Sequence, residues 1–232
     1  MCGTGFKTWP DQDSVMDTPV LIINYKTYRK GSGEKARELS AISQKKSEET
    51  GASIVLAVQN SDIHRINDTV ELPVFGQHVD SEGYGSNTGS DIVDTLKFNG
   101  AEGALINHSE DQVEPDEIKK AVKRCQEKGL TTVVCVDSVS LGEKVERFGP
   151  DFIAYEPPEL IGGDVSVSKA KPEVLEKMVE SVDIPVLTGA GVKTSEDVEK
   201  SLEIGAVGVL VASGIVKAED PGIAIDNLVE PF

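Results

Sequence analysis

Eight short runs of β-branched and other apolar residues, separated by polar segments of helical length, constrain the fold of this chain more than any other feature. The runs occupy residues 19–26, 52–58, 73–79, 103–109, 131–137, 152–158, 184–191 and 207–214. They are too short and too rich in β-branched residues for helices, and they are apolar on both faces, as strands covered by helices must be. The sequence therefore predicts an α/β protein with eight strands.

The segments between these runs indicate a repeated strand–helix unit. Residues 33–51 and 115–130 have the apolar spacing of helices, and each closes on or beside a glycine that would end the helix. Eight units over residues 17–232 average about 27 residues, which suits a compact, single-domain (β/α)8 barrel. An open doubly wound sheet is the alternative, but the chain has neither a G-x-G-x-x-G motif after the first strand nor a G-x-x-x-x-G-K-[ST] motif.

Residues 1–16 precede the first run and carry no targeting signal that we can identify. They lack the apolar centre of a signal peptide and the arginine-rich pattern of a transit peptide. The only tryptophan, Trp9, lies in this stretch. We expect residues 1–16 to form a disordered N-terminal extension and residues 17–232 to form the barrel.

The charge balance excludes two classes of partner. Lys and Arg total 23 and Asp and Glu total 40, so the net charge is −17, which disfavours nucleic acid and anionic membranes. No apolar stretch approaches the roughly 20 residues of a membrane-spanning helix. Two interpretations of the charge stay open: an ordinary acidic protein, or adaptation to a salty cytoplasm in which ions screen the self-repulsion.

The three cysteines indicate a reduced intracellular setting. Cys2, Cys125 and Cys135 have no metal-ligand spacing and do not form an even-numbered disulfide framework. We therefore expect a cytoplasmic protein without a metal site.

Polar side chains follow three of the predicted strands, at the end where barrel enzymes carry their catalytic groups. Asn24 and Lys26 end the first run, two residues apart and so on one face of a strand. Residues 107–110, which read N-H-S-E and include His108, end the fourth run, and Glu156 ends the sixth. Each residue alone has an ordinary structural interpretation. Together at one rim, they indicate a catalytic site.

Small residues follow the last two strands. Residues 188–191 read T-G-A-G and residues 212–214 read A-S-G, and each turn leads toward a predicted helix. Such turns let an anion approach backbone N–H groups, and the loops after strands seven and eight bind phosphate in many barrels. The sequence therefore indicates a phosphorylated substrate.

The motifs N-Y-K, N-H-S-E, A-Y-E-P-P-E-L-I-G-G, L-T-G-A-G-V and V-L-V-A-S-G resemble the triosephosphate isomerase family, in the compact form typical of archaea. The resemblance runs in order from about Val20 to the C-terminus, and Y-E-P-P-E-L-I-G is its most specific part. It implies a TIM barrel that interconverts dihydroxyacetone phosphate and D-glyceraldehyde 3-phosphate in glycolysis and gluconeogenesis, without a cofactor. It also implies a homo-oligomer, with a tetramer favoured over a dimer. The acidic composition favours a haloarchaeal member.

Carried over residue by residue, the resemblance makes Glu156 the base and His108 the neutral electrophile, an assignment for which this family is the standard example. It makes Lys26 the cation that stabilises the enediolate, with Asn24 contacting substrate beside it. Because His108 stands just before an expected helix start, we expect the helix dipole to keep its ring neutral. The resemblance also implies five backbone positions that bind phosphate: Ile161, Gly162, Gly191, Ala212 and Ser213.

The segment after Glu156 resembles the family's lid, with prolines that stiffen the hinge and glycines that fold over the phosphate. This chain has Gly163 and Asp164 where the family usually reads T-G, which puts the lid's kinetics in question. Residues 77–90 stand at the place of the loop that reaches into a neighbouring subunit. His64 and His78 read as structural or surface residues.

Two other functions stay open at this point. One is a phosphate-binding barrel of amino-acid biosynthesis, and the other is a barrel that binds phosphosugars or proteins without catalysis. The joint presence of Lys26, His108 and Glu156 favours the isomerase over both.

Overall fold

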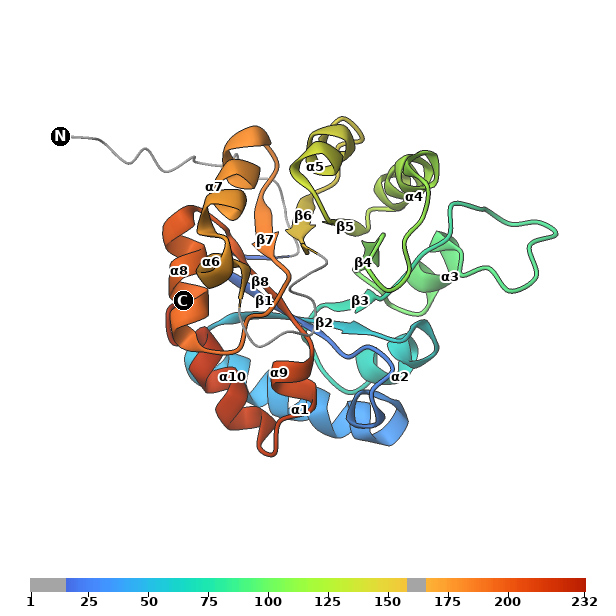
Figure 1. The fold of residues 1–232 in the computed structure, drawn as a ribbon. Coiled ribbons are helices and arrows are strands. Elements are labelled where there is room, and N and C mark those ends of the chain that lie inside the picture. Colours follow the sequence, from blue (N-terminus) through green and yellow to red (C-terminus); the bar gives the residue numbers. More distant parts are fainter. Residues whose placement is uncertain (1–15, 158–165) are drawn as a thin grey trace.

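Eight parallel strands close on one another to form a barrel, and helices surround it (Figure 1). The structure is a computed structural model that describes residues 16–157 and 166–232. β1 pairs with β2 on one side and with β8 on the other, which closes the ring. The eight predicted strands and the (β/α)8 barrel are confirmed, and the open sheet is wrong. The strands are β1 (Val20–Asn24), β2 (Ser53–Val58), β3 (Val74–Gly76), β4 (Gly103–Ile106), β5 (Thr131–Val136), β6 (Phe152–Tyr155), β7 (Val186–Thr188) and β8 (Gly208–Val211).

Helices connect the strands and cover the outside of the barrel. Their ends follow local signals: proline opens α4, α7 and α10, and α1 ends at Gly51, whose φ of 76° a glycine adopts at little cost. The two helices predicted at 33–51 and 115–130 are confirmed. The helical elements are η1 (Arg29–Gly31), α1 (Gly33–Thr50), η2 (Asn60–Asp62), α2 (Ile63–Asn67), α3 (Val93–Phe98), α4 (Pro115–Glu127), α5 (Val139–Glu146), α6 (Val167–Ala170), α7 (Pro172–Ser181), α8 (Ser195–Ile204), α9 (Ser213–Val216) and α10 (Pro221–Val229).

The core has two layers because successive residues of each strand face opposite sides. One set of side chains fills the interior of the barrel, and the other set packs between the strands and the helices. This arrangement explains why the strands are apolar on both faces. The interior layer consists of Met16, Val20, Ile22, Val55, Ala57, Phe75, Leu105, Val133, Cys135, Phe152, Ala154, Leu187 and Leu210.

Met16 corrects the expected start of the barrel. We placed it in the disordered extension, but its side chain is 2% exposed and belongs to the interior layer of the barrel. Residues 1–15 of the expected extension lie outside the described residues, and so do residues 158–165 of the expected lid.

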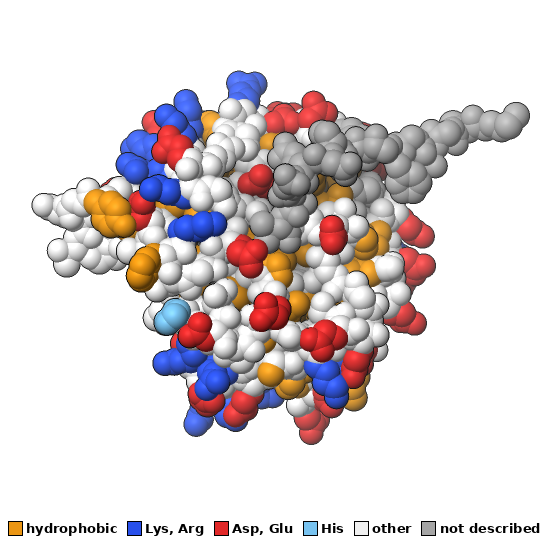
Figure 2. Space-filling model, turned by 180° about the vertical axis from the view of Figure 1, so that it is seen from behind, with side chains coloured by type: hydrophobic (Ala, Val, Ile, Leu, Met, Phe, Trp, Pro, Cys, Tyr) orange, Lys and Arg blue, Asp and Glu red, His pale blue; other side chains and the backbone are white. Residues whose placement is uncertain are grey.

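The surface carries charge of both signs. On the face shown in Figure 2, carboxylates are scattered among lysines and arginines and are not gathered into one patch. Among the described residues, no helix combines the length and the apolar character needed to cross a membrane. The segment between β3 and α3 projects away from the barrel wall (Figure 1).

Candidate active site

A pocket opens at the carboxyl ends of the strands, and the sequence-predicted site residues meet there. Its lining comes from strands and loops that are far apart in the sequence, from β1, β4, β6, β7 and β8. Every predicted site residue that the structure describes lies in this lining, whereas Ile161 and Gly162 fall outside the described residues. The lining residues are Asn24, Lys26, Tyr28, His108, Glu156, Gly189, Gly191, Val192, Lys193, Leu210, Val211, Ala212, Ser213 and Gly214.

Lys26 reaches the pocket through a bend in the backbone and not by the strand alternation that we predicted. β1 ends at Asn24, and Lys26 has a φ of 47°, a left-handed conformation that is uncommon outside glycine. The Oδ1 atom of Asn24 accepts the backbone N–H of Lys26 at 3.0 Å. Gln77 donates its Nε2–H to the carbonyls of Lys26 and Ala57, both at 3.1 Å. These bonds hold the bend and so offset its strain.

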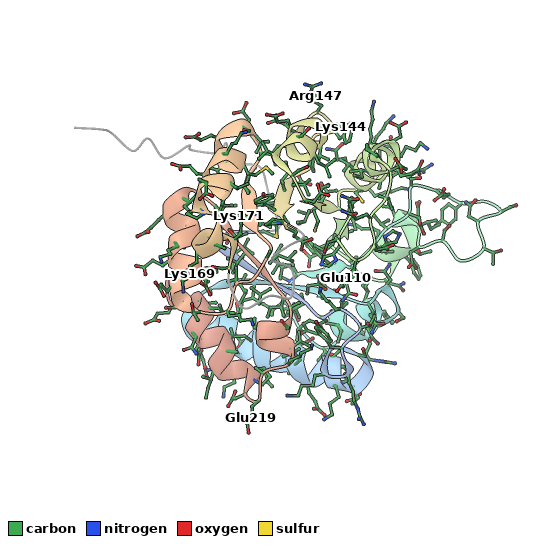
Figure 3. All side chains as sticks on the ribbon, viewed as in Figure 1. Glu110, Lys144, Arg147, Lys169, Lys171 and Glu219 are labelled. Atoms are coloured by element: carbon green, nitrogen blue, oxygen red, sulfur yellow. The ribbon has the colours of Figure 1, made fainter. Side chains whose placement is uncertain are left out.

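Glu110 fixes the other end of the lysine side chain. The Nζ atom of Lys26 lies 2.8 Å from the Oε1 atom of Glu110, in the turn after β4. Glu110 lies near the middle of the barrel face (Figure 3). We predicted no role for Glu110, and its place in the N-H-S-E motif beside His108 is the signal that could have suggested one. The ion pair thus joins a lysine of the pocket lining to an exposed carboxylate of the turn after β4.

Asn107 makes the turn that sends His108 into the pocket. Its φ is 62°, and its side chain bridges two segments: Nδ2 donates to the carbonyl of Cys135 at 2.8 Å, and Oδ1 accepts from the N–H of Val113 at 3.0 Å. Asparagine tolerates this conformation better than other residues with a Cβ. β4 therefore ends at Ile106, and the next side chains turn over the rim.

The hydrogen bonds of His108 fix its tautomer. Its Nδ1 atom lies 3.1 Å from the backbone N–H of Glu110, which can only donate, so Nδ1 accepts and the proton of the neutral ring is on Nε2. Burial, and then the charge of Lys26, lowers the pKa of His108 to about 4. The ring is therefore neutral at pH 7, with a donor that faces the pocket.

The predicted source of this neutrality was wrong. No helix begins directly after His108: a turn follows it, and α4 begins only at Pro115. Instead, desolvation and the charge of Lys26 lower the pKa of His108 and keep its ring neutral.

Glu156 follows β6 and is only 3% exposed. Burial raises its pKa to about 7, while the backbone N–H of Ser109, Lys26 and the thiol of Cys135 act in the opposite direction. The N–H of Ser109 lies 3.4 Å from Oε2, and the Nε2 atom of His108 lies 3.4 Å from Oε1. The carboxylate thus stands beside a neutral imidazole and is poised to gain or lose a proton near neutral pH.

Sequence reasoning missed Cys135 as a neighbour of the site. It lies inside the barrel on β5, directly beside Ala154 of β6, and its thiol hydrogen-bonds to Glu156. Burial raises the pKa of this thiol well above its ordinary value, so it stays protonated and donates. Strand pairing would have indicated this neighbour, because β5 and β6 are adjacent in any (β/α)8 barrel.

The turn after β7 must come close to Glu156, and glycine allows it. The N–H of Gly189 donates to the carbonyl of Tyr155 at 2.9 Å. A Cβ atom on Gly189 would lie 2.5 Å from Cγ of Glu156, so any side chain there would displace the carboxylate. Gly191 has a φ of 72°, which glycine adopts freely.

Gly191, Ala212 and Ser213, three of the five predicted phosphate-binding positions, line the pocket with little side-chain bulk. The turn after β8 leads directly into the short helix α9, as predicted, whereas α8 begins only at Ser195. In residues 16–157 and 166–232, no group of three His, Cys, Asp or Glu side chains is placed to hold a metal ion.

A family model described as triosephosphate isomerase matches residues 19–230. A triosephosphate isomerase from Methanobrevibacter smithii is 43% identical to this chain over 219 residues, which span 92% of this chain and 99% of the relative. One from Methanosarcina barkeri is 44% identical over 219 residues with the same coverage.

A crystal structure of triosephosphate isomerase from Bartonella henselae at 1.6 Å resolution superposes with a TM-score of 0.73, covering 90% of this chain and 98% of that one. Its sequence is 21% identical, so this likeness shows the fold alone.

Proposed function

This chain belongs to the triosephosphate isomerase family, and on that premise we propose that Glu156, His108 and Lys26 interconvert dihydroxyacetone phosphate and D-glyceraldehyde 3-phosphate through an enediolate. The reaction moves one proton between adjacent carbons. It needs a base, a group that stabilises the oxyanion and a site that excludes water. No step calls for a metal or an organic cofactor.

One observation carries the assignment: Glu156 and His108 stand 3.4 Å apart with pKa values moved in opposite directions, to about 7 and about 4. Pairs of groups whose environments separate their pKa values in this way mark acid and base roles. A base with a pKa near the working pH is ionised often enough to act and basic enough to take a carbon-bound proton.

The roles follow from these atoms. The carboxylate of Glu156 removes a proton from C1 of dihydroxyacetone phosphate, and the electron pair moves to the C2 oxygen to form the enediolate. The Nε2–H of His108 donates to that oxygen and the ring takes the proton from the C1 oxygen in return. Glu156 then delivers its proton to C2, which gives the aldehyde. The Lys26 cation stabilises the anion throughout, and Asn24 lies beside it in the pocket wall.

The phosphate group is assigned to the turns after β7 and β8. Gly191, Ala212 and Ser213 supply backbone there without bulky side chains. Ile161 and Gly162 complete the set by resemblance to the family. The other phosphate-binding barrels that we considered are disfavoured by the family match over most of the chain.

We assign the protein to the cytoplasm, to glycolysis and gluconeogenesis, and to a homo-oligomer, with a tetramer favoured and a dimer as the alternative. Two exposed aromatic residues support an assembly: Phe98 is 90% exposed on α3, and Tyr84 is 79% exposed in the projecting segment before it. Covering the two rings at a contact between subunits would remove their apolar surface from water, which is favourable.

The direct test is isomerase activity of the purified chain, measured in both directions at low and at high salt. We expect turnover of both triose phosphates, and light scattering should give a mass of two or four chains. Phe98→Asp should lower that mass, whereas Ile42→Asp, at a moderately exposed site on α1, serves as the control. Absence of isomerisation at every salt concentration would overturn the proposed function.

A further inference from the structure

Asp197, in the first turn of α8, is a buried carboxylate with more partners than a helix cap requires. It is 4% exposed, although it lies three residues after the N-cap residue Thr194. The two residues form a capping box, in which each side chain bonds to the backbone N–H of the other. Such a box uses one oxygen of the acid. The carboxylate of Asp197 makes further bonds that leave the helix.

The Oδ2 atom of Asp197 holds the end of the turn that lines the pocket. It accepts the backbone N–H groups of Lys193 at 3.0 Å and Thr194 at 2.9 Å, and the hydroxyl of Thr194 at 2.9 Å. Gly191, Val192 and Lys193 belong to the pocket wall. Asp197 therefore fixes the backbone that continues directly from the predicted phosphate position at Gly191.

The Oδ1 atom holds a second segment, at the start of α6. It accepts the hydroxyl of Ser166 at 2.8 Å and lies 3.0 Å from Nζ of Lys169, which is seen beside α8 in Figure 3. The hydroxyl of Ser168 donates to the backbone carbonyl of Asp197 at 3.0 Å. Ser166 and Ser168 are both buried, so these bonds are not shared with solvent.

The two segments also meet directly. The N–H of Val167 donates to the carbonyl of Ala190 at 3.2 Å, one residue before Gly191. The turn after β7 is thus held from two sides, by the carboxylate of Asp197 and by the backbone at the start of α6. A buried charge is costly unless it is paired and hydrogen-bonded.

The carboxylate of Asp197 is ionised over the physiological range. Burial raises its pKa, but the N–H of Lys193, the ammonium of Lys169 and the hydroxyls of Ser166 and Thr194 together lower it to about 2. Hydrogen bonds to an ionised acceptor are about twice as strong as neutral ones.

We propose that Asp197 is a positioning residue for phosphate recognition: it clamps residues 193–194 to Ser166 and so holds the turn at Gly191 in the shape that receives a phosphate dianion. The inference rests on the proposed function in one respect, because it takes the pocket to bind a triose phosphate. Asp197 does not itself touch the substrate, since a carboxylate would repel a phosphate. It acts through the backbone that it holds.

The simpler alternative is that Asp197 only caps α8, and Asp197→Glu separates the two roles. Glutamate at this position of a capping box is standard, so α8 should keep its cap. Its extra methylene moves the carboxylate relative to Ser166 and Lys193. We expect the dissociation constant for inorganic phosphate and the KM for both triose phosphates to rise roughly tenfold, with a much smaller change in kcat. Asp197→Asn should show the same effect.

If the Asp197 variants do not fold, two serines that donate to the same carbonyl of Asp197 provide a test variant and its matched control. Ser168 and Ser201 both donate to the backbone carbonyl of Asp197, at 3.0 and 2.7 Å, and both are buried. Ser168 joins α6 to α8, whereas the hydrogen bond of Ser201 stays within α8 and does not tie that helix to α6. Ser168→Ala and Ser166→Ala should weaken phosphate binding, while Ser201→Ala should leave it unchanged.

The experiment measures inorganic phosphate binding by calorimetry, isomerase kinetics and the melting temperature for each variant. Weaker phosphate binding in the Ser166, Ser168 and Asp197 variants, with Ser201→Ala unchanged, supports the clamp. Equal phosphate affinity in folded Ser166, Ser168 and Asp197 variants overturns it and leaves the isomerase assignment intact. A protein that binds phosphate but does not isomerise would overturn the function alone, since the calorimetric comparison needs no turnover.

Discussion

At the scale of single residues, one small pocket holds an acid whose pKa is raised and an imidazole whose pKa is lowered, and burial is the main cause of both. Burial disfavours the charged form of either group, so it raises the pKa of a carboxyl and lowers that of an imidazole. Lys26 then acts on both: its charge opposes the rise at Glu156 and adds to the fall at His108. The pocket therefore favours a base and a neutral donor through desolvation.

We expect Glu156→Gln to reduce kcat by a factor of about 10²–10⁴ or more, because the amide cannot accept the carbon-bound proton. The amide is nearly isosteric, so the barrel and the inorganic phosphate affinity should be preserved. Calorimetric phosphate binding is the control that separates lost chemistry from lost structure. A variant with kcat near that of the parent protein would contradict the assignment of Glu156 as the base.

We expect kcat/KM to fall as the pH drops through about 7, because the base must be ionised and the pKa of Glu156 is raised to about 7. His108 should not contribute in this range, since its pKa is about 4. The measurement is kcat/KM from pH 5 to 9 at constant ionic strength, corrected for the second ionisation of the substrate phosphate near pH 6. Cys135→Ala removes a donor to the carboxylate, so its profile should shift to higher pH. A profile that stays flat from pH 5 to 8 would contradict the raised pKa.

At the scale of the elements, the strands could be predicted from the sequence because a buried parallel strand has a clear sequence pattern: a short apolar run between turn residues. The residues at which the strands end could not be predicted in the same way. The first run extends to Lys26, yet β1 ends at Asn24, and the fourth extends to Ser109, yet β4 ends at Ile106. In both places a residue with a Cβ, Lys26 or Asn107, takes a left-handed conformation, and hydrogen bonds to segments far away in the sequence help to hold it.

The same limit applies to the candidate site. Glu156, His108 and Lys26 could be predicted because their motifs are distinctive and fall at one rim. The roles of Cys135, Glu110 and Asp197 could not be predicted, because they come from strand pairing and from contacts between segments that are separated in the sequence. The expected helix start after His108 was wrong for a related reason: the chain inserts a turn before Pro115, and composition does not reveal it.

The lid prediction also belongs to the elements. Removal of residues 159–162 should leave the barrel folded, since β6 ends at Tyr155 and α6 begins at Val167. Isomerisation should fall sharply, and a larger share of turnovers should release inorganic phosphate and methylglyoxal, because water then reaches the enediolate. Both products can be measured in one reaction, with circular dichroism as the control for folding. Normal isomerisation without extra phosphate release would contradict the lid hypothesis and indicate that residues 159–162 only connect β6 to α6.

At the scale of the whole molecule, the dominant feature of the surface is its excess of negative charge. The net charge is −17, and many of the ion pairs are exposed contacts within single helices, such as Lys35–Glu38 and Lys200–Glu196. Pairs of this kind contribute little stability. The excess carboxylates repel one another over distances that salt screens, with a Debye length of about 10 Å at 0.1 M.

We therefore expect the melting temperature to rise as salt increases from about 0.1 M to several molar, because screening relieves this repulsion. Sucrose is the control, since it strengthens apolar burial without screening charge. The gain in potassium chloride should exceed the gain in sucrose. A melting temperature that is indifferent to salt would contradict adaptation to a salty cytoplasm, and the isomerase assignment would stand.

The buried thiol of Cys135 can serve as a natural probe of how often the native barrel opens. Only a thiolate reacts with alkylating reagents, and this sulfur lies inside the closed ring of strands with a pKa far above its ordinary value. Cys135 is only 1% exposed, so a reagent can reach it only while the structure around it opens. The rate at which Cys135 becomes labelled, read by mass spectrometry on its own peptide, measures how often the native barrel opens, without a dye or an engineered probe.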